Sequence, residues 1–339
     1  MITFRPPART GYSAAVSSTP RFAENLPLVA RVAREVMAVG VDGKLPITTD
    51  LQQRYGVGSG TIQRALAEVR DRGGVGMRSR GQRGTFVTEV DLPRLWQLAQ
   101  LGSLDLLLPA TESTEMRALI TGMAKAVNEA VGVDLTVSVL AGAAARIDGL
   151  ADGLADGAVM SSGALEKVVG LGVDGDPAVT VQNGWCVTSL GHGSYYRDGS
   201  ILVVARDERR SEWRRVGVDS GSSDHKQLSE AEFQTLDTEV VDTPFARIPA
   251  LVRDQTIDAG IWHRVDLMFP PESVGLTLLP LEAPEHQDLL SAMSSAVIVT
   301  PEGSPLHRVL ERIDVQKLVV SENAVPPSAP VALRILTHH

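Results

Sequence analysis

The spacing of apolar residues divides the chain near residue 104 into two kinds of structure. Before that point, apolar side chains recur at three- and four-residue steps in short stretches bounded by glycine, the pattern of small amphipathic helices. Two short runs around the basic tip RGQRG predict a pair of strands. The expected elements are helices over 26–39, 48–55 and 59–72, with Thr48 or Thr49 capping the second, and strands over 76–79 and 85–88.

Beyond residue 104, short apolar runs alternate with longer amphipathic stretches. LDLLLP, DLTVSVLA and GAVMS predict buried strands, separated by helices over 114–131 and 143–154. This strand–helix alternation predicts a parallel sheet with helices on its faces, so we expect an α/β body. A second α/β unit follows, and the late strands within GLTLLPL and AVIVT are expected to rejoin the first.

Two segments resemble each other and predict how the body is built. IDGLADGLADGAVMSS and RIPALVRDQTIDAGIWH each end a helix and place an aspartate, Asp156 or Asp258, before a strand. One such unit per lobe suits a two-lobed binding fold of the type 2 periplasmic-binding-protein kind. In such a fold, a ligand lies between the lobes at the carboxyl ends of the strands.

Shifts in composition predict the domain boundaries. Residues 88–104 read as a hinge carrying a short helix, with Trp96 as a structural anchor. The expected divisions are a flexible arm at 1–24, a helix-turn-helix unit at 25–90, a linker helix at 91–103, a two-lobed body at 104–325 and a tail at 326–339. Lobe 1 is expected at 104–182 and 274–325, and lobe 2 at 183–273.

Charge is distributed unevenly between these parts. Residues 1–90 carry 13 Lys plus Arg against 7 Asp plus Glu, whereas residues 91–339 carry 19 against 34. The basic head can therefore meet a polyanion that the acidic body would repel, although the arginines could also be spread by chance. No apolar run is long enough to span a membrane, and the single Cys186 forms no intrachain disulfide, so we expect a cytoplasmic protein.

The first part of the chain has the residues that major-groove recognition requires. The third helix opens with small residues that let its backbone approach DNA, and the expected wing carries arginines that can neutralise phosphates. The alternative is a small helical domain with a solvated arginine face. The residues expected to contact DNA are Thr49, Ser59, Gly60, Thr61, Gln63, Arg64, Arg78, Arg80 and Arg83.

The segment LPITTDLQQRYGVGSGTIQRAL, followed by GQRGTFV, resembles the N-terminal winged helix of GntR-type bacterial repressors. Leu45-Pro46, Gly56-Val57, Ala65-Leu66 and the run from Gly84 to Val87 carry the likeness. Ser59 and Gln63 stand where the family usually has arginines that touch DNA. The resemblance therefore implies wing contacts but no operator sequence.

Small polar residues stand where the α/β body would place its cleft. Several follow a predicted strand and open a helix, where free amides and hydroxyl groups suit a carboxylate or phosphate. Ordinary helix capping would explain each one singly. The residues expected to bind a small anionic effector are Thr111, Ser113, Thr114, Arg146, Ser161, Ser162, Tyr195, Ser220, Ser222, Ser223 and His263, with Tyr195 or Tyr196 closing the site from a crossover loop.

The candidate motifs for a nucleotide site and a calcium site are not supported by their sequence context. The GxGxxG run from Gly170 to Gly175 follows a helix and leads into Asp176-Pro177, so it is not a nucleotide site. Aspartates at 148, 152 and 156 fit a solvated helix face better than a calcium loop. We expect no metal, no cofactor and no catalytic residue. An enzyme with a regulatory head, and an architectural DNA-binding protein without an effector, remain the alternatives.

The body also resembles the effector domain of the YhfZ-like transcriptional regulators. LWQLAQLGSL, AARIDGLADGLADGAVMSS and IDAGIWH carry this likeness, which covers roughly residues 26–320. It implies a homodimeric regulator with a small-molecule site. The sequence as a whole predicts a cytoplasmic, ligand-responsive transcription factor whose two heads read the two half-sites of an operator.

Overall fold

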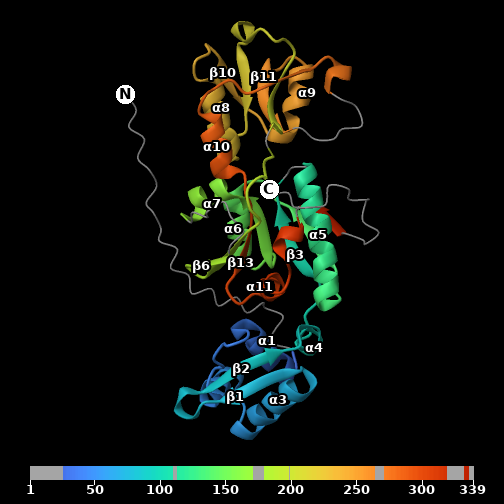
Figure 1. Cartoon of the computed structure of the whole chain (residues 1–339), viewed down its shortest axis with the longest axis vertical. Helices are drawn as coiled ribbons and strands as arrows, with labels where there is room; N and C mark the ends of the chain where they lie inside the picture. Colours follow the sequence, from blue (N-terminus) through green and yellow to red (C-terminus); the bar gives the residue numbers. More distant parts are fainter. Residues whose placement is uncertain are drawn as a thin grey trace.

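A computed structural model describes residues 26–109, 113–170, 179–197, 199–263, 271–318 and 332–335. The described residues form three parts stacked along the long axis of the molecule (Figure 1). An N-terminal head is followed by a central lobe built on a seven-stranded sheet and a distal lobe built on a five-stranded sheet. The expected two-lobed α/β body is therefore confirmed. The expected arm at 1–24 lies outside the described residues.

The head consists of three helices and a two-stranded antiparallel ribbon, as expected from the apolar spacing. Ile47, and not Thr48 or Thr49, precedes the second helix, and no side chain caps it, because the helix already begins at Thr48. Gly56 ends that helix in the left-handed conformation, with φ of 64°, which glycine adopts without strain. The elements are α1 (Leu28–Val39), α2 (Thr48–Tyr55), α3 (Ser59–Arg72), β1 (Val75–Ser79), a 3-10 turn (Gly81–Arg83) and β2 (Thr85–Val90).

Helix α4 (Leu92–Leu98) joins the head to the body as a packed bridge. Asp91 caps its N-terminus, and its buried side chains extend one apolar core from the head into the central lobe. Trp96 is 1% exposed, and its indole Nε1 donates to the carbonyl oxygen of Gly102 at 3.2 Å. The expectation of a structural anchor at Trp96 is confirmed. The segment expected to be a hinge instead packs its buried side chains against both the head and the central lobe.

The central lobe has the strand order β14-β4-β3-β5-β13-β7-β6. Strands β14, β4, β3 and β5 are parallel, and β13 runs antiparallel between β5 and β7. Its elements are β3 (Leu104–Leu108), α5 (Thr114–Val131), β4 (Leu135–Val139), α6 (Ala143–Ala151), β5 (Gly157–Ser161), α7 (Ser162–Val169), β6 (Val179–Gln182), β7 (Trp185–Ser189), β13 (Ala296–Pro301), α11 (Pro305–Leu310), a 3-10 turn (Val315–Leu318) and β14 (Ala332–Ile335).

The distal lobe has the strand order β10-β9-β11-β8-β12, in which β10, β9 and β11 are parallel. Helix α10 (His286–Met293) leads from this lobe back to the central sheet (Figure 1). The other elements are β8 (Ile201–Ala205), β9 (Arg215–Val218), α8 (Ser223–Phe233), β10 (Glu239–Asp242), α9 (Ile248–Arg253), β11 (Ala259–His263) and β12 (Thr277–Leu279), with 3-10 turns at Arg210–Glu212, Phe245–Arg247 and Pro271–Val274.

Three strands correct the expected boundaries. Strand β7, placed in lobe 2 by the sequence, pairs with β13 in the central sheet. Strand β12, expected to rejoin the first lobe, pairs with β8 in the distal sheet. Strand β14 lies within the expected tail but extends the central sheet beside β4. In each case the sequence predicted the wrong sheet for the strand. The residue pattern within a strand does not determine which distant strand it pairs with.

The internal repeat predicted from the two aspartate segments is present in the topology. In each lobe the first three parallel strands, β3, β4 and β5 or β9, β10 and β11, lie in the order second, first, third, with an antiparallel strand beside the third. Asp156 Oδ2 accepts the Asp105 N–H at 2.9 Å, and Asp258 Oδ2 accepts the Arg215 N–H at 2.9 Å. Each aspartate therefore bonds the start of the third of these parallel strands to the start of the first. The two lobes are repeats of one α/β unit.

Candidate functional site

Buried polar side chains gather where the two lobes meet. The chain crosses between lobes after β7 and again through α10, and residues from both lobes pack around the first crossing. Arg146 on α6 and Ser161 at the end of β5 come from the central lobe, while Asp224 on α8 comes from the distal lobe. Tyr195 and Tyr196 lie on the crossing itself. We call these residues, together with Glu115 and His263, the inter-lobe cluster.

Asp224 holds the two lobes together by hydrogen bonds. The Ser161 hydroxyl donates to Asp224 Oδ2, and the Tyr196 hydroxyl donates to the same oxygen at 3.2 Å. The side chain is 3% exposed. Burial raises the pKa of Asp224, while the bonds from Ser161 and Tyr196 act in the opposite direction. The carboxylate is thus a desolvated acceptor shared between the lobes.

Arg146 is the cation of the cluster. It is 4% exposed, and Nη1 donates to the Leu140 carbonyl oxygen at 2.7 Å, while Nε has no hydrogen-bond partner. Among the described residues no carboxylate lies within 4 Å of it. Burial lowers the pKa of this guanidinium, because desolvation disfavours its charge. The Asp224 carboxylate attracts this charge from beyond 4 Å but offsets the desolvation only in part, so this position suits an anionic group.

Glu115 and His263 face each other across the lobes without bonding. Glu115 Oε2 and His263 Nε2 are 3.6 Å apart, which is too long for a hydrogen bond, and both atoms are buried without a partner. Burial lowers the pKa of His263 to about 4, so the imidazole is neutral at neutral pH. The Tyr196 ring lies edge-on to it, with ring centres 5.6 Å apart. Two unsatisfied buried polar atoms therefore lie next to each other where the lobes meet.

The remaining predicted ligand residues divide between capping and the cluster. Ser113, Ser161 and Ser222 accept backbone amides at the starts of α5, α7 and α8, so the capping alternative holds for each of them. Ser161 additionally bonds Asp224. Of the other predicted ligand residues, Thr114 begins α5 and Ser220 is exposed, while Thr111 lies outside the described residues. The Ser162 hydroxyl donates to the Ala292 carbonyl, and the Ser223 hydroxyl donates to Asp224.

Three residues of the cluster were missing from the predicted ligand set. Asp224 and Glu115 each stand in the first turn of a helix, where an acidic residue is favourable on local grounds alone. Tyr196 was weighed as an alternative to Tyr195, and the structure buries Tyr195 and half-buries Tyr196. Only the meeting of the lobes shows that the two carboxylates face inward.

The predicted DNA-contacting residues lie at the surface of the head. All are exposed except Thr61, which is half-buried. Arg64 Nε reaches back to the Gly60 carbonyl at 3.4 Å, and the Arg80 guanidinium lies 4.6 Å from the centre of the Phe86 ring. Opposite them, Ile62, Ala65 and Val69 are buried against the head core. Helix α3 thus presents its slim, polar face outward.

The arginines of the head differ in their partners: on α1, Arg31 lies over the Tyr55 ring and Arg34 donates to the Ala99 and Gln100 carbonyls. Those at 54, 70 and 72 pair with Glu35, Asp71 and Glu68. Within the described part of the chain, Arg64, Arg78, Arg80 and Arg83 form no ion pair with a carboxylate. Their charge is therefore available to an external anion, and these four are the arginines that the sequence assigned to DNA.

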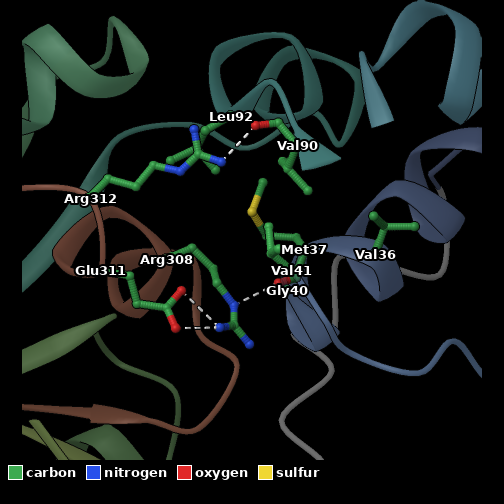
Figure 2. Close-up of a pocket in the computed structure, with 9 residues that line it drawn as sticks. All are labelled: Val36, Met37, Gly40, Val41, Val90, Leu92, Arg308, Glu311 and Arg312. Carbon is green, nitrogen blue, oxygen red and sulfur yellow. Dashed lines mark hydrogen bonds and ion pairs between the residues drawn. The ribbon is translucent and has the colours of Figure 1, made fainter. Parts of the chain in front are cut away.

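A pocket of about 250 Å³ lies between the head and the central lobe (Figure 2). Apolar side chains from α1 and β2 form one wall, and Arg308, Glu311 and Arg312 form the other. Arg308 Nε donates to the Met37 carbonyl at 2.9 Å, and Arg312 Nη2 donates to the Val90 carbonyl at 2.6 Å. Both arginines therefore link the body directly to backbone atoms of the head.

The fold and the cluster define a two-lobed α/β protein with a basic head. Residues 91–327 match the YhfZ C-terminal domain family, so the chain belongs to that family. It is similar to the uncharacterized protein YhfZ of Escherichia coli K12, with 23% identity over 290 residues, covering 84% of this chain and 89% of that protein. The described residues include no helix long and apolar enough to cross a membrane.

Solved structures show a partial likeness. The crystal structure of YhfZ from Shigella flexneri is 23% identical and covers 70% of this chain and 98% of its own, with a TM-score of 0.49. The effector-binding domain of QuiR in complex with shikimate is 13% identical and covers 64% and 95%, with a TM-score of 0.40. Because these scores are below 0.5, the two-lobed assignment rests on the sheet topology.

Proposed function

We propose that this protein is a ligand-responsive transcriptional regulator. The head binds duplex DNA as a GntR-type winged helix, with α3 in the major groove and the β1–β2 ribbon as the wing. The body, of the periplasmic-binding-protein kind, holds a small molecule with an anionic group between its lobes. It binds this molecule without turning it over, so incubation with the purified chain leaves the ligand chemically unchanged.

The observation that supports DNA binding best is the division of the head arginines. Exposed ion pairs contribute little to the stability of a fold. The main effect of pairing Arg70 and Arg72 with neighbouring carboxylates is therefore to neutralise their positive charge. The exposed arginines Arg64, Arg78, Arg80 and Arg83, which have no carboxylate partner among the described residues, lie on α3 and the wing. A protein gains DNA affinity by replacing the counterions of phosphates with such free cations.

The body supports a sensing role through its buried polar atoms. Arg146, Glu115 and His263 each bury a polar atom that has no hydrogen-bond partner among the described residues. These residues come from both lobes, so a ligand that satisfied them would favour one lobe arrangement over another. The Arg308 and Arg312 contacts then connect the central lobe to the head.

We further propose that the protein acts as a homodimer. One head offers a single recognition helix, whereas two heads related by a two-fold axis would read both halves of a pseudo-palindromic operator. Sedimentation of the full chain tests this directly: a species of twice the chain mass is expected, and a monomer at micromolar concentration would contradict it.

The salt dependence of DNA binding tests the DNA-binding role. We expect the combined change Arg80→Ala and Arg83→Ala to weaken binding to all duplexes. It should also reduce the slope of log affinity against log salt by roughly 1.8 per head, about 0.9 for each phosphate contact. The matched control removes the same charge from paired positions, Arg70→Ala and Arg72→Ala, and should change the slope little.

Fluorescence anisotropy of the full chain with a labelled duplex measures both variants. Equal slopes for the two double variants would mean that the unpaired wing arginines are not the phosphate contacts. Absence of any binding by the unaltered chain would refute the proposed function itself.

A further inference from the structure

We infer that the inter-lobe cluster recognises a small zwitterion, a molecule carrying one carboxylate and one ammonium group, of which an amino acid is the simplest class. This inference rests on the proposed binding role of the body, and it does not depend on DNA binding by the head. It narrows the ligand from any anion to molecules with both charges.

Arg146 supplies the site for the carboxylate. Its guanidinium is buried, uses one bond on the Leu140 carbonyl, and leaves Nε unpartnered. A guanidinium presents several N–H donors in a fixed plane that matches the two oxygens of a carboxylate. A carboxylate at this position would satisfy the orphaned donor and neutralise the buried cation at once.

The carboxylates of the cluster supply the site for the ammonium. Asp224 Oδ2 already accepts two hydroxyl groups, but a carboxylate can accept about four bonds in all. Glu115 Oε2 is buried and accepts none. An ammonium group has three donors and no acceptor, so it can bond these oxygens but cannot bond Arg146.

The charge balance of the cluster favours a zwitterion over a simple anion. Two buried carboxylates, Asp224 and Glu115, face the buried guanidinium of Arg146 and the exposed guanidinium of Arg197, whose Nε lies 3.6 Å from Glu115 Oε1, while His263 contributes no positive charge at neutral pH. A dicarboxylate or phosphate would add negative charge beside these two carboxylates, at a cost of several kcal/mol for an uncompensated buried ion. A zwitterion adds no net charge and gives each buried group an opposite partner.

The placement of the charges also ties binding to lobe closure. Arg146 belongs to the central lobe and Asp224 to the distal lobe, and their charges attract each other although no ion pair forms within 4 Å. A ligand with opposite charges can bridge them, with its carboxylate on one lobe and its ammonium on the other. A carboxylate bound at Arg146 alone would engage only the central lobe.

Thermal stability of the full chain with defined probes tests the inference. The probes are the twenty L-amino acids, their D-enantiomers, and β- and γ-amino acids, each beside the matching acid without the amine and the matching amine without the acid. Inorganic phosphate completes the set. At saturating concentration, at least one zwitterion should raise the Tm by roughly 3 °C or more, whereas its single-charge analogues should not.

Titration calorimetry with the best zwitterion then tests the residues. Asp224→Asn keeps the shape of the side chain and should lower affinity by about tenfold or more, and Arg146→Gln should do the same. Asp288→Asn, which removes an exposed aspartate from α10, is the matched control and should bind like the unaltered chain. If either cluster variant fails to fold by circular dichroism, Glu115→Gln replaces it.

Several outcomes would overturn the inference. They are an equal Tm rise with simple carboxylates, with amines or with phosphate, no rise with any probe, and unchanged affinity in the folded Asp224 variant. Because no DNA is present, these results stand apart from the salt-dependence experiment. A failure here would leave DNA binding intact, and a failure there would leave the zwitterion site intact.

Discussion

Arg308 on α11 fastens the head to the body, so its removal should release the head. Its Nε atom donates to the Met37 carbonyl at 2.9 Å (Figure 2), and its Nη2 atom donates to the Ala38 carbonyl at 2.6 Å, both in the last turn of α1. Gly40, with φ of 68°, lets the guanidinium approach: a Cβ there would lie 2.6 Å from Arg308 Cζ. We predict that Arg308→Ala undocks α1 without unfolding the lobes.

The magnitude follows from these bonds. A hydrogen bond from a charged donor contributes about 1.5–3 kcal/mol, and a cation at a helix C-terminus adds about 0.3–1 kcal/mol. Water can replace part of this, because the Arg308 side chain is 15% exposed and the Ala38 bond lies at the surface. We therefore expect head docking to weaken by about 2–4 kcal/mol, near the lower end of the sum.

Hydrogen exchange of the full chain measures this loss. Docking that is weaker by about 2–4 kcal/mol should speed amide exchange in α1 about 30- to 700-fold, with α8 and α9 unchanged. Arg312→Ala removes one bond, to Val90, and should have a smaller effect. Arg209→Ala, in an exposed ion pair of the distal lobe, is the control. Unchanged protection of α1 in Arg308→Ala would refute the coupling role of Arg308.

Two further predictions concern the lobes. Burial would raise the pKa of Glu232, but hydrogen bonds from His286, Arg210 and two backbone amides lower it to about 2. The Glu232 carboxylate therefore stabilises the fold above about pH 4.5, and about 3 kcal/mol is lost as the pH falls toward 2. In urea unfolding, Glu232→Gln should remove this dependence and the exposed Glu230→Gln should keep it. Gly163→Ala places a Cβ 2.8 Å from Met293 Cβ, where α7 meets α10. This should cost about 1–3 kcal/mol and hold the lobes apart, seen as a larger radius of gyration in X-ray scattering; an unchanged radius would count against it.

The local elements of the head were predictable because their signals are local. The bounds of α3 follow from glycines at each end and from apolar side chains on one face, all within one stretch of chain. The same holds for α5, whose N-cap Ser113 and terminal Gly132 mark its ends. Such elements need no knowledge of distant residues.

The assembly of the body was predictable only in outline. The two aspartate segments indicated a repeat, yet the partners of β7, β12 and β14 depend on pairing between distant strands. The candidate site shows the same limit. Arg146 and Ser161 were identified from their positions near strand ends, whereas Asp224 and Glu115 resembled ordinary acidic residues at helix starts.

Sequence-specific DNA binding by the full chain tests the central claim most directly. A duplex enriched by the protein from a random-sequence pool should bind, at physiological salt, at least about 10³-fold more tightly than a shuffled duplex of the same composition. Fluorescence anisotropy measures both affinities under one condition. Equal affinity for the two duplexes, or failure to enrich any sequence, would contradict the assignment of the protein as a transcriptional regulator.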